Sequence, residues 1–232
     1  MSADFRQSHH LPKLRPGNEA PDPMGLPRQR RGITPQLHGR YPDYDVLEQA
    51  PHWDEETRKV VLDRVTNAPE YRFFEQREVE ILSLFCDLVL AQDREPRIPV
   101  LRYVDDKLWN GRLDGFRFAD MPDDRETWRL LARRLDELGF GEAEFERQHE
   151  LVEQLSKAEL DGLPPRTWKV TTRAILSAFY AHPWAWNEIG FGGPAYPRGY
   201  MRLGIEQHEP WEAAPAFDID PERDVKERGL ER

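Results

Sequence analysis

The stretch from Glu78 to Leu108 reads EVEILSLFCDLVLAQDREPRIPVLRYVDDKL, and its apolar pattern decides the fold class. In its first half, apolar residues recur at i, i+1, i+4, i+7 and i+8, namely Ile81, Leu82, Phe85, Leu88 and Val89. This spacing puts them on one stripe of an α-helix, which we predict over 75–92. Pro96 is expected to stop this helix, because proline lacks the backbone N–H that a helix interior uses.

Helical spacing continues along the chain. The second half of the stretch predicts a helix over 99–110, with Val100, Val104 and Leu108 on one face. Further helices are predicted over 55–66, 123–139 and 167–181, and one beginning near Glu142 is expected to bury Phe145, Val152 and Leu155. No segment alternates apolar and polar residues with period two, and there is no Asn-Gly or Asp-Gly hairpin signal. The sequence therefore predicts an all-α protein, a bundle of five or six helices.

The two ends of the chain differ from this body. Residues 1–45 contain seven prolines, which predicts an extended, Pro-rich arm without a core of its own. The helical domain is expected over 46–204, followed by an irregular acidic tail over 205–232. Residues 1–40 carry seven Lys and Arg against three Asp and Glu, so this part has a charge of +4 and the remainder −14. An acidic body disfavours nucleic acid, whose recognition needs a basic surface.

The sequence lacks the common motifs for catalysis, phosphate binding and metal binding. It has no Gly-rich phosphate loop, no HExxH metal motif and no GxSxG nucleophile elbow. The seven histidines are scattered, and the single cysteine, Cys86, is surrounded by apolar residues that predict a buried, unreactive thiol. No apolar run reaches the roughly 18 residues that a membrane span needs. We therefore expect no catalytic, cofactor-binding or metal-binding residue in this chain.

One segment near the C-terminal end is unusually aromatic. Residues His182 to Tyr200 read HPWAWNEIGFGGPAYPRGY, and their prolines and glycines predict a loop, with a bend at the GFGG sequence of 190–193. Pro183 is expected to end the preceding helix. So much rigid apolar surface predicts that the segment packs against the chain's own core or against a partner.

Three stretches together resemble the gluconate 2-dehydrogenase subunit 3 family, the small subunits that accompany GMC-type flavoprotein sugar and alcohol dehydrogenases. The first two carry Val100, Tyr103, Val104, Asp105 and Leu108, and then Leu135, Asp136, Phe145, Gln148 and Leu155. The third carries Trp186, Ile189, Gly190, Phe191, Gly193 and Pro194. The chain departs from the family where only Trp184 and Ala185 separate Pro183 from Trp186. It also departs at Arg30-Arg31, which no apolar export signal follows.

The resemblance implies a non-catalytic accessory subunit that supports the folding, stability or export of a flavoprotein large subunit, with FAD in that partner. The aromatic segment can cap the helical bundle, face the partner, or do both. We expect Trp186 and Ile189 to fold back onto the bundle and Trp184, Phe191 and Tyr196 to face outward. The expected partner interface comprises Trp184, Trp186, Phe191, Gly193, Pro194 and Tyr196. The expected location is cytoplasmic, or exported only with a signal-bearing partner.

Two other functions stay open at this point. A free-standing all-α enzyme could gather His182, Tyr180 and an acidic residue such as Glu188 at the helix end. A nucleic-acid-binding arm could use Arg28, Arg30, Arg31 and Arg40, although the acidic body disfavours it.

Overall fold

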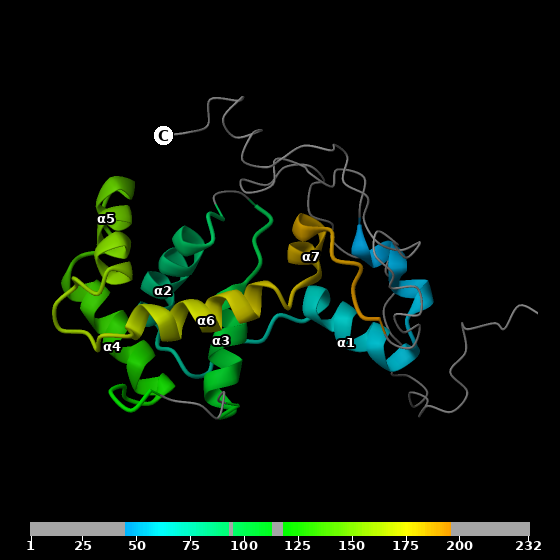
Figure 1. Ribbon diagram of the computed structural model, residues 1–232, viewed down its shortest axis with the longest axis horizontal. Helices are drawn as coiled ribbons and strands as arrows, with labels where there is room; N and C mark the ends of the chain where they lie inside the picture. Colours follow the sequence, from blue (N-terminus) through cyan, green and yellow to red (C-terminus); the bar gives the residue numbers. More distant parts are fainter. Residues whose placement is uncertain (1–44, 93–94, 113–117, 196–232) are drawn as a thin grey trace, which may run out of the picture. The chain divides into compact units, whose positions relative to one another are not determined.

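The computed structural model describes residues 45–92, 95–112 and 118–195, so the predicted arm and tail lie outside the described residues apart from Asp45. All regular elements within the described residues are helices, and no β-strand occurs there, which confirms the all-α prediction. In chain order (Figure 1) the elements are the 3-10 helix η2 (Val46–His52), α1 (Glu55–Thr66), α2 (Gln76–Val89), α3 (Val100–Trp109), α4 (Asp124–Glu137), α5 (Phe145–Ser156), α6 (Thr167–Phe179) and α7 (Pro183–Ile189).

These elements belong to two compact units. The first unit combines the described residues up to Asn67 with those from Ala181 onward, so it holds η2, α1 and α7. The second unit runs from Ala68 to Tyr180 and holds α2 to α6. The first unit is therefore built from two segments that are distant in sequence.

The second unit buries the apolar stripes that the sequence predicted. Helix α3 packs on α6 and α2, α4 packs on α2 and α6, and α5 contacts α6 and α2. The largest fully buried side chains include Phe85, Trp128 and Phe140, and the ring of Phe85 meets that of Phe140 edge-on. Burying one such side chain stabilises the fold by about 1.5–3 kcal/mol. Cys86 is buried beside them, and burial raises the pKa of its thiol, as expected for an unreactive cysteine.

One core prediction in this unit is wrong. Phe145, the first residue of α5, is 53% exposed, whereas Leu151 and Leu155 form the buried stripe of that helix. Phe145 precedes Leu151 by six residues, which turns its side chain about 120° away from the stripe. Its ring instead lies 6.2 Å from the ring of His149, one turn later on the same exposed side.

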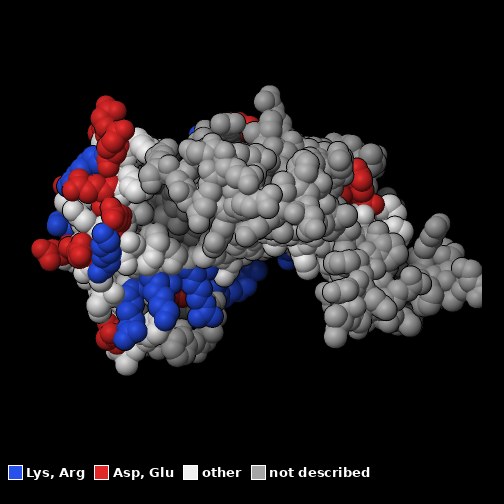
Figure 2. All heavy atoms as spheres, turned by 45° about the horizontal axis from the view of Figure 1, so that its top comes forward, with Lys and Arg blue, Asp and Glu red and all other residues white. Residues whose placement is uncertain are grey.

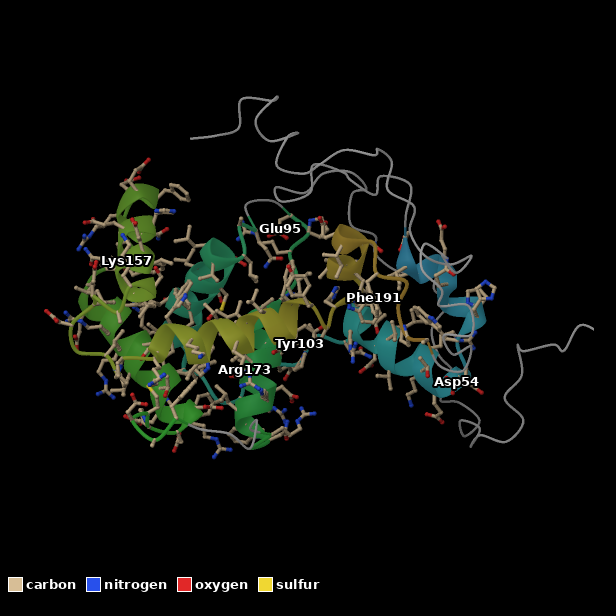
Figure 3. All side chains as sticks on the ribbon, in the orientation of Figure 1. Asp54, Glu95, Tyr103, Lys157, Arg173 and Phe191 are labelled. Atoms are coloured by element: carbon tan, nitrogen blue, oxygen red, sulfur yellow. The ribbon has the colours of Figure 1, made fainter. Side chains whose placement is uncertain are left out.

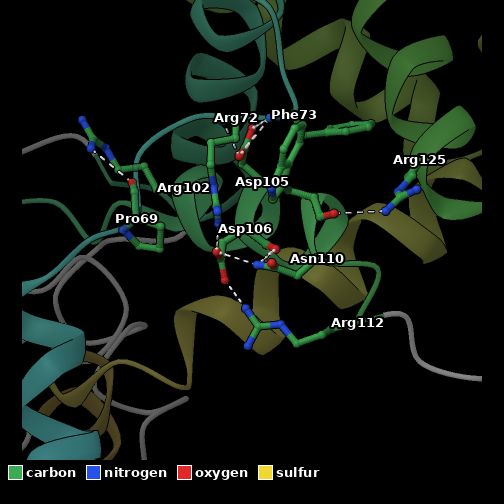
Figure 4. Close-up of polar contacts among 10 residues, drawn as sticks. Pro69, Arg72, Phe73, Arg102, Asp105, Asp106, Asn110, Arg112 and Arg125 are labelled. Atoms are coloured by element: carbon green, nitrogen blue, oxygen red, sulfur yellow. Dashed lines mark hydrogen bonds and ion pairs between the residues drawn. The ribbon is translucent and has the colours of Figure 1, made fainter.

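A buried carboxylate joins α3 to the segment before α2 (Figure 4). Asp105 is fully buried, and its Oδ1 accepts a hydrogen bond from the Arg72 backbone N–H at 2.8 Å. Its Oδ2 accepts from the N–H groups of Phe73 at 3.0 Å and Phe74 at 2.9 Å. One carboxylate thereby satisfies three successive backbone donors, of which the Phe74 N–H is buried and the other two are partly buried. Asp105 is one of the residues that carry the family resemblance, and the structure gives it a structural role.

Candidate functional site: an aromatic groove in the first unit

Part of the aromatic segment is a helix, so the prediction of a loop over its whole length is wrong. Helix α6 already ends at Phe179, and Pro183 begins α7 instead of terminating α6. Proline is tolerated in a first helical turn, where its missing N–H has no intrahelical acceptor. Gly190 follows α7 with φ of +66°, a left-handed conformation that glycine adopts at helix ends. The helix breakers therefore flank this short helix and do not interrupt it.

The burial of the aromatic residues differs in part from the expectation. Trp186 packs with Val46, Leu47, Trp53, Val61 and Leu62 in the core of the first unit, as predicted for an inward-facing residue. Trp184, expected to face outward, is only 7% exposed, and Ile189, expected to face inward, is 45% exposed. Trp184 is buried because α7 is enclosed on all sides: residues 183–186 turn by about 100° each, and all four are buried. Ile189 is the last residue of α7, beyond this enclosed turn.

Polar contacts fix α7 to the other two elements of the first unit. The Asn187 Oδ1 accepts a hydrogen bond of 2.7 Å from the backbone N–H of Val46 in η2. From α1, the Arg64 Nη1 donates to the Ala181 carbonyl at 2.8 Å, and its guanidinium lies 5.8 Å from the centre of the Trp186 ring. This distance is within the range of a cation–π contact. The two segments of the first unit are thus joined by directional bonds as well as by apolar packing.

His182 caps α7 and is buried. Its Nδ1 accepts a hydrogen bond of 3.2 Å from the Trp184 backbone N–H, and its ring also bonds to the Arg64 backbone. Burial lowers the pKa of His182 to about 4, and the positive charge of Arg64 acts in the same direction. The imidazole is therefore neutral at pH 7, with both nitrogens engaged by the backbone.

These contacts weaken the alternative of a catalytic site at the helix end. A general base needs a nitrogen that can reach the substrate, and both His182 nitrogens are occupied inside the protein. Tyr180, its expected companion, is the exposed C-cap residue of α6 and belongs to the second unit. Within the described residues, no group of His, Cys, Asp and Glu is placed to hold a metal ion.

Gly193 is packed against η2 and the residue after it. A Cβ atom at this position would lie 2.7 Å from Trp53 Cζ2 and 3.1 Å from Val46 Cγ2. The backbone φ of +76° also falls in the left-handed region, where side chains cause strain. Gly193 therefore fixes the path of the chain after α7. Its contribution to the predicted interface would be to shape the backbone there, not to contact a partner.

A groove of about 370 Å³ lies between α1 and the segment after α7. We call it the aromatic groove. Its apolar lining consists of Val60, Val61, Trp186, Phe191 and Pro194, and its polar lining of Glu56, Thr57 and Arg64. Figure 3 shows Phe191 beside α1 and α7, and the Phe191 ring meets that of Trp186 edge-on at 5.4 Å. Val60 is 55% exposed and Phe191 is 41% exposed, so the groove presents apolar surface to its surroundings.

The groove brings together three of the six predicted interface residues, Trp186, Phe191 and Pro194. Trp184 and Gly193 are buried in the first unit and do not line the groove, and Tyr196 lies outside the described residues. Sequence reasoning missed the contribution of α1, namely Val60 and Arg64. The sequence feature that could have indicated α1 is the pair Val60-Val61 in a largely polar helix. Adjacent residues of a helix face different directions, so when Val61 enters the core Val60 is left on the surface.

The family model described as gluconate 2-dehydrogenase subunit 3 matches residues 76–193, half of the chain. The chain belongs to the gluconate 2-dehydrogenase subunit 3 family. The matched region begins at the first residue of α2 and ends at Gly193, so it includes α7 and Phe191. No curated protein and no solved structure matches the chain. None of the helices in the described part is both long and apolar enough to cross a membrane.

Proposed function

We propose that this protein is a non-catalytic accessory subunit of a heteromeric, FAD-dependent oxidoreductase. Its partner is a GMC-type flavoprotein large subunit that binds FAD and acts on a sugar or an alcohol. The small subunit supports the folding, stability or export of that partner. The complex is cytoplasmic, or it is exported only by association with a signal-bearing subunit.

The family match is the observation that carries this proposal. The family is named as subunit 3 of a dehydrogenase, and a numbered subunit works within an assembly. The match covers α2 to α7, so the proposal concerns most of the described helices.

The aromatic groove supports a partner contact at the end of the matched region. Val60 and Phe191 are exposed apolar side chains that line one concave surface, with Arg64 among its polar residues. Aromatic residues and arginine are enriched at the energetic centres of protein interfaces. The groove is also held in shape before binding, because Gly193 and Trp186 are packed in the core of the first unit. Less conformational entropy is then lost on docking.

Co-purification tests this function. The chain is tagged, expressed in its native host and isolated, and the eluate is examined for a larger second polypeptide and for flavin absorbance. We expect a stoichiometric flavoprotein and sugar- or alcohol-dependent dye reduction in the eluate. The separated small subunit should be colourless and inactive. Flavin bound by the separated small subunit, or turnover by it, would contradict the proposal.

A further inference from the structure

The second unit contains a small pocket whose lining is apolar inside and basic at the edge. Helices α3, α4 and α6 and the residues before α4 contribute to it. Its interior is lined by buried side chains that include Val104, Leu108, Met121 and Trp128. Lys107, Lys169 and Arg173 also line it, with Asp124 as the one acidic lining residue. The pocket shares no residue with the aromatic groove.

The size of this pocket excludes a cofactor. Its cavity is about 50 Å³, whereas sites for cofactors and drug-sized ligands enclose roughly 300–1,000 Å³. A volume of this order suits part of one apolar side chain. The occupant that fits is therefore a single side chain presented by a larger molecule.

The rim of the pocket is positively charged. The three lining cations and one lining carboxylate leave a net charge of +2, on a chain whose total is −10. The ammonium of Lys169 lies 5.0 Å from the centre of the Phe118 ring, and the guanidinium of Arg166 lies 4.6 Å from the same ring. Lys169 of α6 and Arg166, the N-cap residue of that helix, therefore lie against the same aromatic ring. Figure 2 shows Lys and Arg side chains gathered in a row on this unit, at the lower left of the view.

We infer that this pocket is a docking site for an acidic segment of a partner protein, which inserts one apolar side chain between α3, α4 and α6. Carboxylates on either side of that side chain meet Lys107, Lys169 and Arg173, while the apolar interior of the pocket accepts the side chain itself. Like charge on the rim repels basic segments and so gives selectivity. The inference goes beyond the proposed function, because it concerns a separate surface and any partner with this chemistry.

Fluorescence anisotropy of labelled peptides on the full chain tests the inference. The probe is a short peptide of Asp and Glu residues with one central Leu, and two comparison peptides carry a central Ala or replace the acidic residues by Lys. We expect the Leu peptide to bind about tenfold more tightly than the Ala peptide, in line with the burial of several methyl groups. The Lys peptide should not bind. Raising the salt concentration should weaken binding of the Leu peptide.

Two variants locate the binding. Ala174→Leu fills the pocket without changing its charge, and it should lower the affinity for the Leu peptide to that of the Ala peptide. Arg173→Glu reverses a rim charge and should lower the affinity about tenfold. Arg133→Glu is the matched control, because Arg133 is exposed on α4 and does not line the pocket, and it should change the affinity less than twofold. Thermal melts of all three variants establish that they fold.

Two peptide results would overturn the inference: no binding of the Leu peptide at about 1 mM, or equal binding of the Leu and Ala peptides. Two results with the variants would also overturn it. These are an equal effect of Arg133→Glu and Arg173→Glu, and unchanged binding in a folded Ala174→Leu variant. Inorganic sulfate that displaces the peptide completely at low millimolar concentration would assign a plain anion site instead. Self-association that competes with the peptide would assign the pocket to a second copy of the chain.

Discussion

At the residue scale, two residues within the family match, Gly193 and Asp105, have a structural role that involves the backbone, and neither has a catalytic one. Gly193 combines a left-handed backbone with a neighbouring tryptophan that leaves no room for a Cβ atom. Asp105 is a buried carboxylate whose acceptors are used by three backbone N–H groups. Both residues hold segments in place, so their substitution should affect stability before it affects any partner.

Gly193→Ala is expected to lower the free energy of unfolding of the first unit by about 2–4 kcal/mol. Left-handed strain contributes about 1–2 kcal/mol, and forcing Trp53 to move contributes a similar amount. Gly139→Ala is the matched control, because Gly139 has φ of +67° but no atom within 4 Å of an added Cβ. The Gly139→Ala variant should lose only the free energy of the left-handed strain, about 1–2 kcal/mol. Equal losses in urea denaturation of the two variants would show that Trp53 does not constrain Gly193.

Asp105→Ala is expected to destabilise the second unit by about 3 kcal/mol, since it leaves one buried and two partly buried N–H groups without an acceptor. Asp106→Ala provides the comparison at the next position. Asp106 bonds to Arg72, Arg112 and Asn110 near the surface, where such pairs contribute about 1 kcal/mol or less. Guanidinium denaturation of both variants measures the difference. A loss at Asp106 as large as that at Asp105 would contradict the role assigned to the buried carboxylate.

At the scale of elements, the apolar period predicted most helices to within a few residues. Residues 55–66 were predicted as they are observed, and 167–181 extends only two residues beyond α6. The two short elements, η2 and α7, were missed, because a helix of seven residues has too few turns to show a period and both contain proline. Helix α7 depends instead on caps and tertiary contacts, namely His182, Gly190 and Trp186.

The cap of α7 makes the first unit sensitive to acid. Because burial lowers the pKa of His182 from 6.5 to about 4, the unfolded chain binds a proton in this window that the folded protein does not. The free energy of unfolding should therefore fall as the pH falls from 6.5 to 4, by about 3 kcal/mol from this group. His182→Asn keeps a side-chain acceptor for the Trp184 N–H but does not titrate.

The test compares the stability of the wild-type protein and the His182→Asn variant across this pH range. The stability advantage of the wild-type protein should shrink steadily toward pH 4, since carboxylates titrate alike in both proteins. Parallel curves would show that His182 does not titrate with the lowered pKa that its burial produces.

At the scale of the whole molecule, the sequence identified the aromatic segment but not the surface it builds. Trp186, Phe191 and Pro194 were expected at an interface from their residue types and from the family resemblance, and the structure brings them together with Val60 and Arg64 of α1. More than a hundred residues separate α1 from α7, and a periodic pattern carries no information about such pairing. The burial of Trp184 was equally inaccessible, because it depends on which segments enclose α7.

The central claim is that the chain binds a flavoprotein partner through the aromatic groove. The most direct measurement is the affinity of the purified large subunit for the wild-type chain, for Phe191→Ala and for Phe145→Ala. Phe145 is the matched control, since it is an exposed phenylalanine of the second unit, outside the groove. We predict that Phe191→Ala weakens binding about thirtyfold, equivalent to about 2 kcal/mol for an aromatic anchor, with an unchanged melting temperature. Phe145→Ala should bind like the wild-type chain. Equal affinity of all three proteins, or a loss in Phe191→Ala only when its fold is also lost, would contradict the claim.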